Sequence, residues 1–141
     1  MILKRVRGMF ASGGAATAPD ASDERLRGRT YAVPFDEVWE CSVRLAGGGL
    51  SGWRVLEADD VAGVLRAAQR GRLRRAERAA TVRIGFDADA QTRVDLDIAG
   101  APGGPDFGAA ARAIHRFCRA LDRELIRRRG ESTQGPIRLD A

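Results

Sequence analysis

The sequence predicts an α+β domain in which one antiparallel sheet of about five strands packs against a long C-terminal helix. Residues 82–86 and 94–98 alternate apolar and polar side chains, which is typical of strands with one covered face. Residues 107–125 instead carry apolar side chains at helical spacing. The length of 141 residues is that of one domain with a single core.

The expected order is strand, helix, four strands and helix. Residues 30–33 form a short strand, and Asp36 and Glu37 suit the positive end of the helix that follows. The three glycines at 47–49 end that helix. Asp106 is the expected N-cap of the last helix. The four strands between the helices are predicted at residues 53–57, 64–70, 81–86 and 93–98.

We expect the folded domain to span residues 29–129. Residues 1–28 are predicted to be a flexible basic segment and linker, because residues 11–23 are rich in Gly, Ala and Ser. Residues 130–141 are predicted to be a loose tail. Within residues 1–10, apolar side chains recur at helical spacing between basic ones, which indicates an anchor for an anionic membrane or a partner. A frayed terminus is the alternative.

Positive charge is concentrated in two segments. Residues 66–78 and residues 112–129 each carry +5, which leaves −5 for the rest of a chain whose net charge is +5. Lys4 is the only lysine, so nearly all of this charge is guanidinium, a bidentate ligand for carboxylate and phosphate. A solvated helix face is the alternative. The candidate surface for an anion or a partner comprises Arg70, Arg72, Arg74, Arg75, Arg112, Arg116, Arg119, Arg123 and Arg127.

Catalytic and metal-binding patterns are absent from the sequence. His115 is the only histidine, and Cys41 and Cys118 lie far apart outside any Cys-x-x-Cys motif. Asp95 and Asp97 point to one sheet face, where ion pairing with arginines is the expected use. We therefore predict a protein that is not an enzyme and has no cofactor. With no apolar run of about 20 residues and no signal peptide, a cytoplasmic location is expected, with peripheral membrane association as the alternative.

Several short stretches resemble the uncharacterised bacterial family catalogued as domain of unknown function 1499. The resemblance covers roughly residues 30–126, and it implies a fold but no known chemistry. Where members of that family carry an Arg-Ser-x-Ser-Arg run, this chain reads Asp97-Ile98-Ala99-Gly100-Ala101, so it resembles a divergent member. The matching stretches are Pro34 to Trp39, Gly52-Trp53-Arg54-Val55, Gly63-Val64-Leu65-Arg66-Ala67, Val94-Asp95-Leu96 and Asp106-Phe107-Gly108-Ala109.

The stretch from Pro34 to Trp39 also resembles the START-like, or helix-grip, domains, whose fold is related in outline to TBP-like sheets with a long helix. That resemblance implies an apolar ligand held between sheet and helix. The candidate pocket residues are Trp39, Trp53, Phe86 and Phe117, although an ordinary core has the same pattern.

Two functions are therefore carried forward. The first is a binding or accessory module whose arginine-rich surface meets an acidic protein or an anionic membrane surface. The second is a small carrier of hydrophobic ligands. Nucleic acid is the less favoured partner, because no stacking aromatics are interleaved with the arginines. A homo-oligomer is left open.

Overall fold

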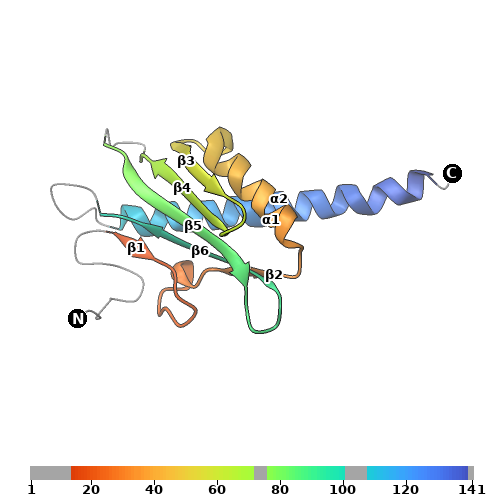
Figure 1. Cartoon of the computed structure of the whole chain (residues 1–141), viewed down its shortest axis with the longest axis horizontal. Coiled ribbons are helices and arrows are strands. Elements are labelled where there is room, and N and C mark those ends of the chain that lie inside the picture. The colour runs from red at the N-terminus through yellow and green to blue at the C-terminus, as the bar shows by residue number, and fades with distance from the viewer. Residues whose placement is uncertain (1–13, 72–75, 101–107, 140–141) are drawn as a thin grey trace.

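Six antiparallel strands form one sheet, and a long C-terminal helix crosses it (Figure 1). The computed structural model describes residues 14–71, 76–100 and 108–139, with side chains as far as residue 130. The strand order is β1-β6-β5-β4-β3, and β2 pairs with the same edge of β6 as β1. The strands are β1 (Ala15–Ala16), β2 (Arg29–Tyr31), β3 (Trp53–Asp59), β4 (Val64–Gln69), β5 (Arg78–Phe86) and β6 (Thr92–Ile98).

The expected α+β class is confirmed, and the sheet is not closed into a barrel. The alternation that predicted β5 and β6 sorts their side chains onto two faces. In β6 every second residue from Thr92 to Ile98 is buried, and the residues between them are only partly exposed. Val82 pairs with Leu96 on the covered face, whereas Arg83 pairs with Asp95 on the open face. One face of the sheet therefore builds the core and the other meets solvent.

Helix α1 (Phe35–Arg44) begins after Pro34, as expected from the acidic residues in its first turn. It buries Val38, Cys41 and Ser42 against the core. A single wide helical turn, η2 (Leu45–Gly49), follows α1 directly. Within this turn Gly48 has a φ of +121°. Because glycine adopts this φ without steric cost, the glycine run ends the helix where the sequence predicted.

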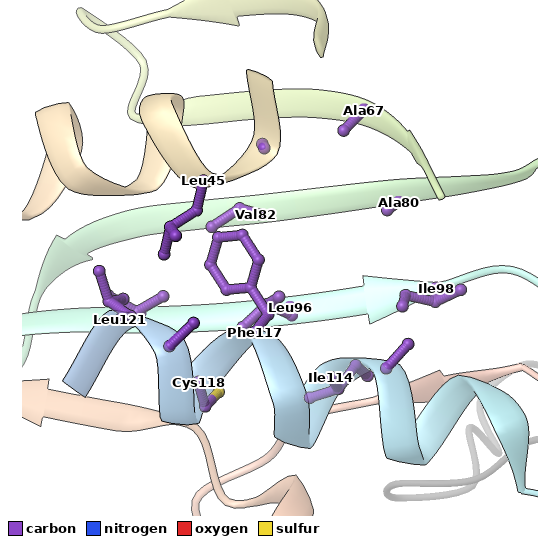
Figure 2. Packing of buried hydrophobic residues seen from close by; sticks show 14 of the residues in the cluster. Leu45, Ala67, Ala80, Val82, Leu96, Ile98, Ile114, Phe117, Cys118 and Leu121 are labelled. Atoms are coloured by element: carbon purple, nitrogen blue, oxygen red, sulfur yellow. The ribbon is translucent and has the colours of Figure 1, made fainter. Parts of the chain in front are cut away.

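Helix α2 (Ala109–Leu139) covers the apolar face of the sheet. Its inner side chains Ile114, Phe117 and Leu121 are fully buried. Figure 2 shows Phe117 gathered with Leu45 and Val82, which come from η2 and β5. The predicted N-cap Asp106 lies outside the described residues. These contacts connect the two helices and the central strands in one core.

The far end of α2 differs from the loose tail that we expected for residues 130–141. The helix continues to Leu139 and extends well past the sheet (Figure 1). At about 1.5 Å per residue, its 31 residues span roughly 46 Å. Once a helix is nucleated, each further residue other than proline adds a hydrogen bond without repeating the nucleation cost, so the end can extend beyond the core.

Residues 14–28 also differ from the flexible linker that we expected. Ala15 and Ala16 pair with Ile98 and Asp97 of β6, and Ala15 is fully buried. The single-turn helix η1 (Glu24–Leu26) then inserts Leu26 into the core. Small side chains pair at a sheet edge as readily as they form a linker, so composition alone did not separate the two. Residues 1–10, the predicted anchor, lie outside the described residues.

Candidate functional site: an arginine stripe on α2

Five arginines form a stripe on the face of α2 that is opposite the core. All are exposed, and they recur every three or four residues along the helix. We call them the α2 arginine stripe: Arg112, Arg116, Arg119, Arg123 and Arg127. Ile126, which is 73% exposed, lies beside the end of the stripe. The helical spacing of the sequence predicted this arrangement, and the structure brings these five candidates together on one face.

The three central arginines of the stripe have no anionic partner among the residues that the structure describes. Arg116, Arg119 and Arg123 form no ion pair with any residue that the structure describes. Arg127 differs, because it binds Glu124 one turn earlier. The stripe therefore contains a central positive segment whose charge is not neutralised within the described chain.

Arginines on the α1 side of α2 are paired instead. Arg128 binds Glu40 with an N–O distance of 3.3 Å, and Arg44 of α1 binds Glu124. The hydrogen bond from Arg44, followed by that from Arg127, holds the pKa of Glu124 below its usual value. These pairs connect the two helices, so their arginines serve the fold.

A second connection lies on the other flank of α2. Arg29 donates from its Nε to both carboxylate oxygens of Asp122, at 3.1 and 3.2 Å. The Tyr31 hydroxyl donates to the same carboxylate at 2.6 Å. Burial, reinforced by Asp122, raises the pKa of Tyr31. Together these contacts attach β2 to the helix.

The other arginine candidates do not join the stripe. Arg70 is exposed just after β4, and no contact joins it to the α2 arginine stripe. Arg72, Arg74 and Arg75 lie outside the described residues. The structure therefore brings the five candidates on α2 together on one face and does not join Arg70 to them.

The four candidate pocket aromatics divide into two groups. Trp53 and Phe117 are buried, and their rings lie 4.9 Å apart in the core. Trp39 stacks on Phe35 at 5.8 Å, and Phe35 in turn contacts Phe86 at 6.2 Å. Trp53 and Phe117 fill the space between sheet and helix, whereas Phe86 is 66% exposed at the end of the sheet.

The other residues considered for catalysis or metal binding, His115, Cys41 and Cys118, are partly or fully buried. His115 is partly buried, and desolvation, followed by the nearby Arg119, lowers its pKa. Cys41 and Cys118 are both buried and free, and burial raises the pKa of Cys118 to about 11. Within the described residues, no three His, Cys, Asp or Glu side chains gather in a way that could hold a metal ion.

Comparisons with family models, curated proteins and solved structures give no match. The resemblances to the family of unknown function and to START-like domains therefore stay predictions. No described helix combines the length and the apolar character needed to cross a membrane.

Proposed function

We propose that the chain is a non-enzymatic binding module whose α2 arginine stripe docks on an acidic protein surface. The observation that carries the proposal is the contrast along one helix. Arginines on the flank of α2 are ion-paired, whereas the central Arg116, Arg119 and Arg123 are exposed and have no anion within the described chain. Charge complementarity then favours an acidic partner.

The geometry of the stripe suits carboxylates arranged along a helix or a strand. Arg116 and Arg123 are separated by seven residues, or about 10 Å along the axis. Guanidinium groups bind carboxylates through two parallel hydrogen bonds, which makes the contact directional. A partner with acidic side chains at a similar spacing would engage all three central arginines at once.

An anionic membrane is the weaker alternative. Each arginine near such a surface contributes about 1 kcal/mol, so three give about 3 kcal/mol, which is less than a millimolar affinity requires. Stable attachment needs apolar insertion as well, and Ile126 is the large apolar side chain exposed beside the stripe. A protein surface can add packing around the arginines, which a headgroup layer does not.

The location of the protein and the alternative function as a carrier of hydrophobic ligands are considered in turn. A cytoplasmic location is supported by the two free, buried thiols of Cys41 and Cys118. The carrier of hydrophobic ligands is not favoured, because Trp53 and Phe117 pack on each other between sheet and helix.

The test uses a fluorescent acidic peptide of about 20 residues, with glutamates at helical spacing, and follows its binding by anisotropy. Replacing Arg116, Arg119 and Arg123 with Gln should weaken binding at least about tenfold, because three charge-assisted contacts are lost. The matched control replaces three exposed arginines away from α2, Arg27, Arg54 and Arg66, with Gln and so removes the same charge.

Equal weakening in the control would show that net charge, rather than the stripe, drives binding. Vesicles containing phosphatidylserine form the second arm of the experiment. If the stripe were needed for binding to vesicles and the peptide did not bind, the partner would be a membrane rather than a protein.

A further inference from the structure

A hollow of about 250 Å³ opens on the solvent-facing side of the sheet. It lies where β4, β5 and β6 run side by side, near the turn between β3 and β4. This location makes it independent of the α2 arginine stripe. Its lining includes Ala62, Val64, Arg83, Gly85, Arg93 and Asp95.

Arg93 and Asp95 form a fixed, neutral pair in this hollow. Arg93 donates from Nε to one Asp95 oxygen at 3.0 Å and from an Nη to the other at 2.8 Å. The same Nη donates to the Arg27 carbonyl at 2.7 Å. Thr17 adds a hydroxyl donor to Asp95 at 2.7 Å. The Asp95 carboxylate is therefore already bound through both of its oxygens.

Arg83 is left without an anion as a result. It lies directly opposite Asp95 in the β5–β6 register, where a cross-strand ion pair was expected. It is exposed and makes no ion pair with any residue in the described part of the chain. With two arginines and one aspartate among its lining residues, the hollow carries one net positive charge.

The remaining lining is apolar and leaves room for a ligand. A Cβ placed on Gly85 would meet no atom within 4 Å, so the backbone of β5 is open to solvent there. Val64, which pairs with Arg83 across β4 and β5, is only partly buried, and the neighbouring Ala62 is exposed. The Phe86 ring lies on the other face, against Phe35 of α1. A cation beside an open strand and two accessible apolar side chains is suited to an anion with an apolar body.

We propose that this hollow binds a small monocarboxylate that carries an apolar group. The Arg83 guanidinium takes the carboxylate, while the apolar group packs against Val64 and Ala62. A single net charge favours a monoanion over a dianion such as phosphate, and a volume of about 250 Å³ limits the ligand to a small molecule.

The test is an NMR titration of the ¹⁵N-labelled protein with phenylacetate. We expect saturable shifts of the amide signals of Val64 and Gly85. Arg83→Gln should weaken binding at least about tenfold, because it removes the charged donor and no contact of the fold. Arg66→Gln is the matched control. Like Arg83, Arg66 is exposed, but it lies on β4 and pairs with Glu57 outside the hollow. We expect its replacement to change the affinity for phenylacetate by less than about twofold.

Two further measurements separate the parts of the proposal. Gly85→Val should block phenylacetate by filling the hollow, while dispersed spectra show that the sheet is retained. Acetate and phenylacetamide, which lack the ring and the charge respectively, should both bind at least about tenfold more weakly. Equal binding of phenylacetate by Arg83→Gln, or of acetate and phenylacetate by the unaltered protein, would overturn the proposal, as would inorganic phosphate binding more tightly than phenylacetate.

Discussion

The Asp95 carboxylate is held by Arg93, its neighbour two residues along the same strand. Residues two apart on a strand point to the same face, so the pair forms without any long-range arrangement. Thr17 binds the same strand: its hydroxyl group donates a hydrogen bond to Asp95 and accepts one from the Leu96 amide. The ion pair consequently helps to hold the residue after β1 at the edge of β6.

Asp95→Asn should lower the free energy of unfolding by about 1 kcal/mol, since it removes a half-exposed ion pair that also holds Thr17. Urea unfolding monitored by circular dichroism measures the change. Glu57→Gln, which breaks the more exposed pair with Arg66, is the control, with an expected loss below about 0.5 kcal/mol. Equal losses would mean that the network around Thr17 adds no stability.

Tyr31 should make the protein less stable in alkaline solution. Burial and the bond to Asp122 raise its pKa in the folded state, so its contribution to stability is complete below its unfolded pKa of about 10 and is lost above it. From about pH 10 upward, stability should fall by up to about 1.4 kcal/mol per pH unit from this group.

The comparison for this prediction is Tyr31→Phe, which lacks the ionisable hydroxyl. Urea unfolding between about pH 8 and pH 11 should give a steeper decline for the unaltered protein. The buried Cys118 is present in both proteins, so its own titration cancels in the difference. Parallel curves would contradict the prediction.

Gly63→Ala should destabilise the β3–β4 hairpin. Gly63 has a φ of +72°, and a Cβ there would lie 2.1 Å from the Ile84 carbonyl oxygen. We expect a loss of about 2 kcal/mol or more, because both the backbone conformation and the close approach are violated. Gly85→Ala, whose Cβ meets nothing within 4 Å, should change stability by less than about 0.5 kcal/mol. Thermal unfolding of the two variants measures the difference.

Phe117→Ala should cost more stability than Asp95→Asn or Gly63→Ala. The ring is fully buried and lies against Trp53, so its removal leaves a cavity between sheet and helix and costs about 3–5 kcal/mol. Ile126→Ala on the same helix removes a side chain that is 73% exposed, and its effect should stay below about 0.5 kcal/mol. Chemical denaturation compares them, and a small effect at Phe117 would mean that the helix packs loosely.

Strong local patterns made most of the fold predictable. The alternation through Val82 and Leu96 predicted two paired strands, and the helical spacing of Ile114, Phe117 and Leu121 predicted the helix that covers them. These patterns record which side faces the core, and burial of that side dominates the energetics. The same helical spacing also placed the exposed arginines of α2 on one face.

Features that depend on competition between distant groups were not predictable. Ala15 and Ala16 carry no periodic signal, and their strand exists only because β6 offers a free edge. The sequence put Arg83, Arg93 and Asp95 on one face but could not show which guanidinium obtains the carboxylate.

The pairing of β1 and β2 with one edge of β6 has a consequence for biosynthesis. Thr17 bonds to a residue 79 positions later in the chain, so the first part of the domain has no partner until β6 has left the ribosome. Translation proceeds at about 5–20 residues per second, which leaves this segment waiting for several seconds. Residues 15–17 are therefore among the last of the described residues to pair, and a slow step in maturation should be sought at that edge rather than in the core.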